Sequence, residues 1–154
     1  MKFSAPLISA ADFSVSRKFY EEVFGLKVIC DFGANITFEG GFSLQTKKTW
    51  AEFIGKSEEE ILTKSNNFEL YFEEEDFDGF LEHLKKFPEI ELVHGVKTFP
   101  WGQRGIRFYD PDKHILEVGE TMTAVIKRFL KQGLSVEETS KITMMPMEYV
   151  KSCL

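Results

Sequence analysis

The chain has 154 residues, of which 43% are hydrophobic and 29% are charged, and its formal net charge is −6. This length and composition are typical of one globular domain and exclude disordered and collagen-like proteins. No apolar run approaches the roughly 20 residues that a membrane-spanning helix needs, and the acidic balance disfavours binding to the phosphate backbone of nucleic acids.

The N-terminus and the cysteines indicate the compartment. Residues 1–6 show neither the apolar core nor the small-residue cleavage site of a secretory signal. Only two cysteines occur, Cys30 and Cys153, which is too few for a disulfide framework, and their spacing matches no zinc motif. We therefore expect a reducing, cytoplasmic location.

The first part of the chain predicts a strand, a helix and three further strands. Residues 3–10 are apolar and predict the first strand, and Asp12 or Ser14 can cap the helix that follows. Gly25 can end this helix in the left-handed conformation. One side of the helix is expected to be buried, because apolar residues recur there at helical spacing: Val15, Phe19, Tyr20, Val23 and Phe24. Strands are then predicted over residues 26–32, 35–38 and 42–46.

A polar stretch, residues 48–65, separates this part from the next. Its Ser57-Glu58-Glu59-Glu60 sequence is a capping box that predicts the start of a short helix. We interpret the stretch as a connector, and a lid over a binding site is the alternative.

The same order of elements then returns. Residues 67–73 predict a strand, Asp76 or Asp78 can cap a helix that Pro88 stops, and strands are predicted over residues 90–98, 105–109 and 114–118. The two parts, about residues 3–47 and 66–119, therefore repeat one pattern of strand, helix and three strands. Together they predict a two-module domain over residues 1–120.

Residues 121–154 predict a helical tail with a pattern similar to a small helix-turn-helix. The tail carries 5 Lys and Arg against 3 Asp and Glu. This positive excess is too small to neutralise many phosphates. We therefore expect the tail to pack on the rest of the chain or on a partner subunit, and we expect no DNA binding.

Two segments resemble a known superfamily. Residues 12–26, DFSVSRKFYEEVFGL, resemble the first helix of the glyoxalase/bleomycin-resistance/extradiol-dioxygenase (vicinal oxygen chelate) superfamily. Residues 100–104, PWGQR, and 108–117, FYDPDKHILE, resemble its closing hairpin. The resemblance covers residues 3–119 and implies an α+β fold, in which paired βαβββ modules form an open curved-sheet cup. The C-terminal helical extension would follow these modules. The resemblance also implies a homodimer and a ligand inside the cup.

The resemblance also implies metal ligands on the first and last strands of each module. These positions correspond to Ala5, to Ser43 or Gln45, to Glu69 and to Glu117. Alanine cannot bind a metal, and a neutral hydroxyl or amide is a weak ligand. We therefore assign no cofactor to the chain. The alternative is a divalent ion (Mg²⁺, Mn²⁺, Ni²⁺ or Zn²⁺) on Glu69 and Glu117, whose oxygen ligands favour Mg²⁺ or Mn²⁺ over Zn²⁺.

Six residues are candidates for contact with a ligand, because they are carboxylates, cations or aromatics on the implied cup strands and loop: Glu69, Tyr71, Trp101, Arg104, Arg107 and Glu117. Trp101 follows a proline in a loop and can stack on a flat ligand. Arg104 and Arg107 flank the seventh strand, where one of them can meet an anionic group or simply pair with Glu69 or Glu117.

The leading prediction is a small-molecule binding protein of the glyoxalase/bleomycin-resistance type, with its ligand in an aromatic, acidic cup and no catalytic metal. The first alternative is a metal-dependent lyase, isomerase or dioxygenase of the same superfamily, in which Glu69 and Glu117 would be catalytic. The second alternative is a non-catalytic assembly or regulatory partner that acts through the tail. Neither nucleic acid nor a membrane is an expected partner.

Overall fold

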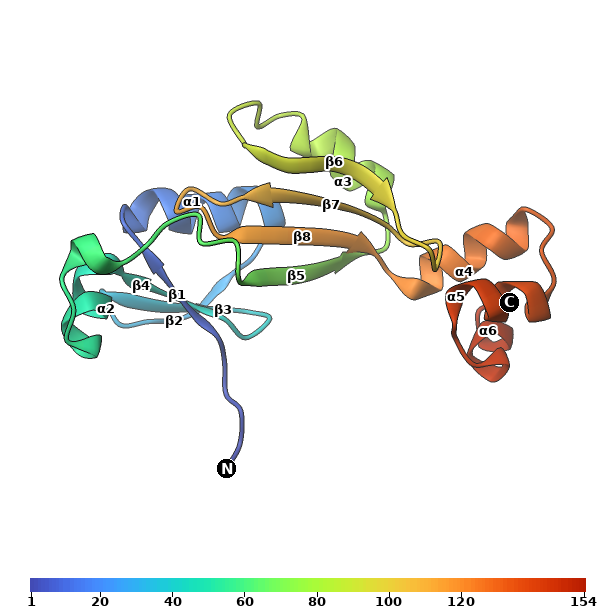
Figure 1. Cartoon of the computed structure of the whole chain (residues 1–154), viewed down its shortest axis with the longest axis horizontal. Helices are drawn as coiled ribbons and strands as arrows, with labels where there is room; N and C mark the ends of the chain where they lie inside the picture. The colour runs from blue at the N-terminus through green and yellow to red at the C-terminus, as the bar shows by residue number, and fades with distance from the viewer. The chain divides into compact units, whose positions relative to one another are not determined.

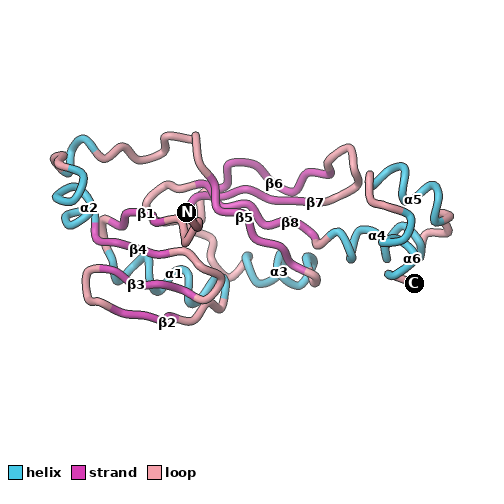
Figure 2. The backbone as a smooth tube through the Cα atoms, turned by 90° about the horizontal axis from the view of Figure 1, so that it is seen from below, coloured by secondary structure: helices cyan, strands magenta, loops and turns pink.

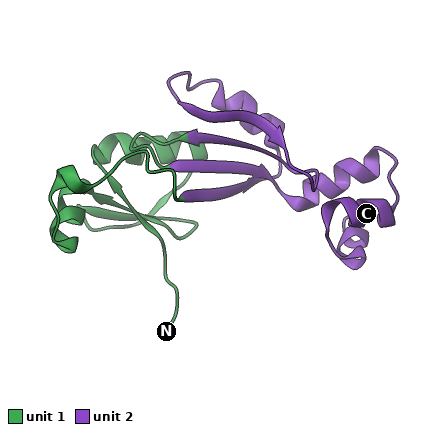
Figure 3. Ribbon diagram, viewed as in Figure 1, with its two compact units in different colours: residues 1–68, 109–114 green, residues 69–108, 115–154 purple.

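The computed structural model describes all residues, 1–154, and shows a mixed α+β protein with two four-stranded open sheets and six α-helices. The chain divides into two compact units. Unit 1 contains residues 1–68 and 109–114, and unit 2 contains residues 69–108 and 115–154 (Figure 3). None of the helices has the length and apolar character that a membrane crossing needs.

Unit 1 contains the first sheet, two α-helices and a short 3-10 turn. Its strands lie in the order β1-β4-β3-β2, with β1 parallel to β4 and the other pairs antiparallel. The bounds are β1 Leu7–Ala10, α1 Phe13–Phe24, β2 Val28–Asp31, β3 Asn35–Phe38, β4 Ser43–Thr46, α2 Lys47–Ile54 and η1 Glu58–Glu60.

One face of the first sheet packs on α1. Ile8, Leu44 and Ile36 lie in one row across β1, β4 and β3, and all three are buried. Tyr20 on α1 is also fully buried, and its ring lies 5.6 Å from that of Phe38. The alternation of inward and outward side chains along each strand therefore places the core of unit 1 between sheet and helix.

The Asp-Pro-Asp turn at residues 110–112 also contributes to this core. The buried Asp110 carboxylate accepts hydrogen bonds from Tyr20 Oη at 2.8 Å and from the ring of His114 at 2.9 Å. Asp112 accepts from the backbone N–H of Ala11 at 2.7 Å and from Ser16 Oγ at 2.5 Å. The turn therefore fixes the beginning and the middle of α1.

Unit 2 contains the second sheet, with strand order β5-β8-β7-β6, and four α-helices (Figure 1). Strand β5 is parallel to β8, whereas β6 is antiparallel to β7. The bounds are β5 Glu69–Glu74, α3 Phe77–Leu84, β6 Leu92–Thr98, β7 Arg104–Tyr109, β8 Ile115–Glu120, α4 Met122–Lys131, α5 Val136–Thr143 and α6 Met147–Ser152.

The second sheet has one apolar face, which packs on α3. Leu70 pairs with Leu116, and Phe108 stacks on Phe80 of α3 with a centroid distance of 6.3 Å. The side chains that alternate with these residues along each strand point to the opposite face of the sheet. Strand β8 continues into α4 after Thr121, whose side chain caps the helix, and α5 and α6 pack in sequence beyond it (Figure 2).

The predicted α+β fold with a helical C-terminal extension is confirmed. The structure also contains a helix that was not predicted from the sequence, α2, which begins one residue before the stretch interpreted as a connector. The capping box at Ser57 and Glu60 is present, but it starts only a single 3-10 turn. The division into residues 1–120 and 121–154 stays a prediction.

We expect Tyr20→Phe to destabilise the protein by about 1–3 kcal/mol, because it removes a donor from the buried carboxylate of Asp110. Urea unfolding would measure the change. Tyr149→Phe is the matched control, because that hydroxyl makes a solvent-exposed hydrogen bond with Thr123. A loss as small as that of the control would contradict the structural role of Tyr20.

His114 should make stability depend on pH. Burial alone would lower the pKa of His114, but the hydrogen bond and charge of Asp110 outweigh it and raise that pKa above its ordinary value. A raised pKa means that the charged ring stabilises the fold below the unfolded pKa of about 6.5, and this stabilisation is lost as pH rises through the folded pKa. His114→Gln should therefore lower the melting temperature more at pH 6 than at pH 9. An equal loss at both values would contradict this prediction.

Candidate functional site

The candidate site lies on the face of the second sheet opposite α3, which we call the polar face. In β5 and β8, Glu69, Tyr71 and Glu117 point to this face, because Tyr71 pairs with Glu117 and the buried Leu70 and Leu116 point the other way. Arg107 of β7 joins them through its ion pairs. The polar face therefore brings together four of the six candidate residues.

Arg107 lies between two carboxylates. Its Nε donates to Glu69 Oε2 at 2.9 Å, and its Nη2 donates to Glu117 Oε2. The side chain of Glu117 is only 7% exposed, whereas that of Glu69 is 39% exposed. On the other side of the guanidinium, Nη1 lies 3.4 Å from His94 Nε2 of β6. The two carboxylates are thus bound to a cation of the chain itself.

This arrangement separates the acidities of the two carboxyls. The hydrogen bond from Arg107 lowers the pKa of Glu69 below its ordinary value. Burial raises the pKa of Glu117, against the opposing charge of Arg107. The hydrogen bond to Glu69 in turn raises the pKa of Arg107, so that this side chain is a permanent cation.

The aromatic loop, residues 99–103, connects β6 to β7 and contributes Trp101. The Trp101 and Phe99 rings stack at a centroid distance of 4.9 Å and an interplanar angle of 9°. The Arg107 guanidinium lies 5.6 Å from the Phe99 centroid, within cation–π range. Trp101 therefore joins the same cluster as Arg107 through Phe99.

Gln103 fixes the aromatic side chains and is not among the residues predicted from the sequence. Its side-chain oxygen accepts from Trp101 Nε1 at 2.8 Å, and its Nε2 donates to Tyr71 Oη at 2.8 Å and to the backbone oxygen of Glu120 at 2.6 Å. Tyr71 Oη donates onward to Glu73 at 3.2 Å. The buried side-chain amide of Gln103 thus holds Trp101 through its oxygen and Tyr71 through its nitrogen.

Two glycines allow these rings to lie close to the sheet. A Cβ atom at Gly119 would be 3.1 Å from both Tyr71 Oη and Gln103 Nε2. A Cβ atom at Gly105 would be 3.0 Å from the Phe99 ring and 3.2 Å from Glu117. Larger residues at these two positions would therefore push the rings and the carboxylate away from the strands.

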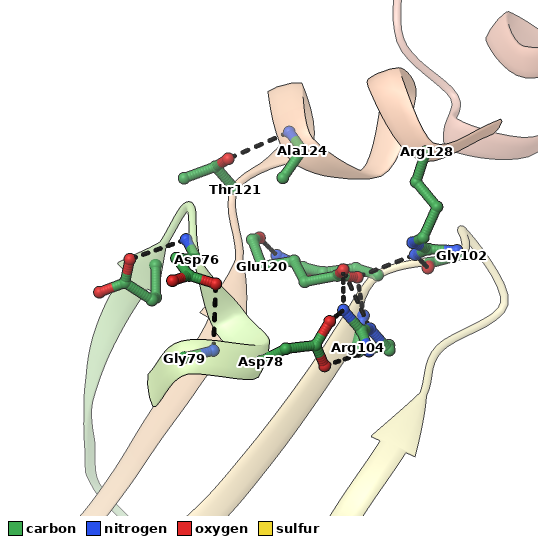
Figure 4. Close-up of polar contacts among 11 residues, drawn as sticks. Asp76, Asp78, Gly79, Gly102, Arg104, Glu120, Thr121, Ala124 and Arg128 are labelled. Carbon is green, nitrogen blue, oxygen red and sulfur yellow. Dashed lines mark hydrogen bonds and ion pairs between the residues drawn. The ribbon is translucent and has the colours of Figure 1, made fainter. Parts of the chain in front are cut away.

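The structure does not bring Arg104 together with the other candidates. Arg104 lies three residues before Arg107 on β7, so it points to the opposite side of the strand. There its Nη2 donates to Glu120 at 2.8 Å and its Nη1 to Asp78 at 2.8 Å (Figure 4). Arg128 of α4 donates to the same Glu120 at 2.8 Å. Because side chains alternate between the two faces of a strand, the sequence alone could have shown that Arg104 and Arg107 point to opposite faces.

The residues at the implied metal positions do not fit a metal. Ala5 has no ligating side chain, Ser43 pairs with Thr37, and Gln45 donates to Thr49. The remaining two, Glu69 and Glu117, both bind the Arg107 guanidinium. No group of three or more His, Cys, Asp or Glu side chains gathers in a way that could hold an ion.

Unit 2 also contains an apolar cavity of about 360 Å³ between α3 and β6. It lies on the α3 side of the sheet, and Leu84, Leu92, Val96 and Ile106 are among the residues that line it. None of the six candidate residues lines this cavity.

Solved structures with a similar fold include glyoxalase-related proteins. A protein of unknown function from Agrobacterium tumefaciens str. C58 is 36% identical, with a TM-score of 0.70, and the match covers 79% of this chain and 94% of that one. A glyoxalase-related enzyme from Fulvimarina pelagi is 18% identical over 78% and 88% of the two chains, with a TM-score of 0.65. A lactoylglutathione lyase from Agrobacterium tumefaciens is 21% identical over 78% and 93%, with a TM-score of 0.59. At these lower identities, the last two show the fold alone.

The family follows from the sequence match. Residues 3–123 match the model of the glyoxalase-like domain, so the chain belongs to that family. The superfamily resemblance noted in the two sequence segments is thereby confirmed. No curated protein matches the chain.

We expect Arg107→Gln to destabilise the protein by about 1–3 kcal/mol at pH 7.5, because Glu117 would lose its ion-pair partner in a buried position. Without the cation, the two carboxylates would repel each other and take up a proton, so the loss should shrink at pH 5. Thermal unfolding at both pH values would measure this. Arg17→Gln, which removes two exposed ion pairs, with Glu21 and Asp31, is the control. A loss that grows toward pH 5 would contradict the prediction.

Proposed function

We propose that this chain is a small-molecule binding protein of the glyoxalase/bleomycin-resistance type. It binds a cationic aromatic ligand on the polar face, without a catalytic metal. The observation that carries the proposal is the position of Arg107 between Glu69 and Glu117. A cation of the chain neutralises these carboxylates in part, at the positions where the resemblance implies metal ligands.

The charge of the polar face supports a cationic ligand. Glu69, Glu73 and Glu117 contribute three carboxyl groups, against the two cations Arg107 and Lys97, the latter paired with Gly105 on the same face. The hydrogen bond from Arg107 keeps the pKa of Glu69 low, so that Glu69 is ionised at neutral pH. The excess of carboxylates attracts a cation and repels an anion.

The aromatic side chains support a flat ligand. Tyr71 is 47% exposed, and Trp101 is half-buried in the loop beside it. Both are held by Gln103, so neither ring has to be ordered when a ligand arrives. A cation over an aromatic face gains about 0.5–2 kcal/mol.

The test uses phenyltrimethylammonium, an aromatic cation, and benzyl alcohol as a neutral aromatic probe. Calorimetric titration should show binding of the cation and little binding of the alcohol. Glu117→Gln should weaken the binding of the cation about tenfold, a change of about 1.4 kcal/mol, because it removes a negative charge beside Arg107. Trp101→Ala should weaken binding by a similar factor, through the loss of the stacking surface.

Glu89→Gln is the matched control, because it removes one negative charge from an exposed turn after α3. It should leave the affinity unchanged. The same proteins titrated with Mn²⁺, Ni²⁺ and Zn²⁺ should show no rise in melting temperature. A rise that Glu117→Gln abolishes would contradict the proposal, as would equal binding of the two aromatic probes.

The homodimer and the cytoplasmic location stay predictions, and so does an assembly role for the C-terminal helices. The metal-dependent lyase, isomerase or dioxygenase remains the alternative from the sequence. No observation on the polar face favours it, because Arg107 binds both candidate carboxylates.

A further inference from the structure

Helix α4 contacts the aromatic loop directly. Arg128 Nη2 donates to the backbone oxygen of Gly102 at 2.7 Å and to Glu120 Oε2 at 2.8 Å (Figure 4). Glu120 is 3% exposed and also accepts from the backbone N–H of Arg104 at 2.9 Å. One guanidinium thus joins the loop to the end of β8.

The contact between α4 and the loop is close enough to require a glycine. Gly102 has a φ of +85°, which other residues rarely adopt. A Cβ atom at this position would overlap the ring of Phe129 and lie 3.6 Å from Val125 Cγ1. The sequence of the loop is therefore adapted to the helix that packs on it.

The sheet fixes the rotation of α4. Thr121 follows β8 directly, and its N–H donates to the backbone oxygen of Glu74 of β5 at 3.1 Å. Its side-chain oxygen caps the helix by accepting from the N–H of Ala124. At 3.6 residues per turn, Val125 and Arg128 lie on the same side of the helix as Thr121. The helix therefore places these side chains on the loop through its connection to β8.

Glu120 connects this contact to the polar face. Its carboxylate binds Arg104 and Arg128, while its backbone oxygen accepts from Gln103. Gln103 in turn binds Trp101 and Tyr71. Hydrogen bonds to the carboxylate and to the backbone oxygen of Glu120 therefore link α4 to both aromatic side chains.

We propose that α4 sets the position of Trp101 and thereby the affinity of the polar face, with Arg128 and Phe129 as positioning residues. The part that concerns affinity rests on the proposed function. Both residues lie beyond the matched glyoxalase-like region, which ends at residue 123. The C-terminal segment therefore adds control of the binding surface to the domain. Because such coupling is reciprocal, a bound ligand also stabilises the packing of α4.

The experiment uses the full chain with Trp50→Phe, which leaves Trp101 as the single tryptophan. Arg128→Ala should raise the quenching of Trp101 fluorescence by acrylamide and lower its anisotropy, because the loop loses its contact with α4. The same variant should bind phenyltrimethylammonium about tenfold more weakly. Arg128→Lys keeps the charge but replaces the guanidinium, whose Nη2 bonds both Gly102 and Glu120, so it should lie between the wild type and Arg128→Ala.

Lys131→Ala is the matched control, because Lys131 is an exposed cation on the same helix. It should change neither the fluorescence nor the affinity. Circular dichroism verifies that each variant is folded. If Arg128→Ala does not fold, Phe129→Leu takes its place, since it keeps the ion pair with Glu120 and removes only the ring against Gly102.

The two readouts separate the proposals. Failure of phenyltrimethylammonium to bind the unchanged protein overturns the proposed function and, with it, the part of this inference that concerns affinity. The Trp101 signal still tests the positioning by α4. A Trp101 signal in Arg128→Ala equal to that of Lys131→Ala overturns the positioning role. A changed Trp101 signal with unchanged affinity overturns the coupling of α4 to the polar face.

Discussion

The second sheet depends on two Arg–Glu pairs that connect β7 to β8 on opposite faces. Arg107 pairs with Glu117 on the polar face, and Arg104 pairs with Glu120 on the other side. Both glutamates are almost fully buried, and a buried carboxylate without a partner is strongly destabilising. The arginines are three residues apart, as are the glutamates, so one strand pairing satisfies both carboxylates. The positions of Arg104 and Arg107 on β7 therefore determine which carboxylates are paired within the sheet and which can bind other groups.

The two pairs have different consequences because their surroundings differ. Arg107 is shared between Glu117 and the half-exposed Glu69, beside aromatic rings that solvent can reach, so this pair contributes to a surface that can bind a ligand. Burial alone would raise the pKa of Glu120, but hydrogen bonds from Arg104 and Arg128 outweigh it and keep that pKa below its ordinary value. Glu120 is thus an ionised carboxylate that holds α4 through its ion pair with Arg128. Gln103 connects the two by bonding to the backbone of Glu120 and to the rings of the polar face.

Sequence reasoning recovered the features that depend on local periodicity and capping. The cap at Asp12, the left-handed Gly25 and the stop of α3 before Pro88 all follow from neighbouring residues, and the structure contains each of them. The resemblance added the paired-module fold. Helix α2 was missed because it begins directly after β4, with Thr46 as its cap, and has only eight residues. The hydrogen bond from Tyr20 to Asp110, 90 residues away, has no local pattern in the sequence.

The candidate site was predictable to the extent that strand alternation specifies a face. Glu69, Tyr71 and Glu117 share a face because β5 and β8 pair with Tyr71 opposite Glu117, and a shift of one residue would turn the β5 side chains to the other face. Gln103 could not be predicted, because an amide in a loop acquires its role from three partners on β5, on β8 and in the loop itself. Arg128 differs again, since its rotation on α4 follows from the cap at Thr121 but its acceptor on Gly102 does not. Residues that act through long-range hydrogen bonds therefore determine the geometry of the polar face, although residues with a recognisable local pattern supply its charges and rings.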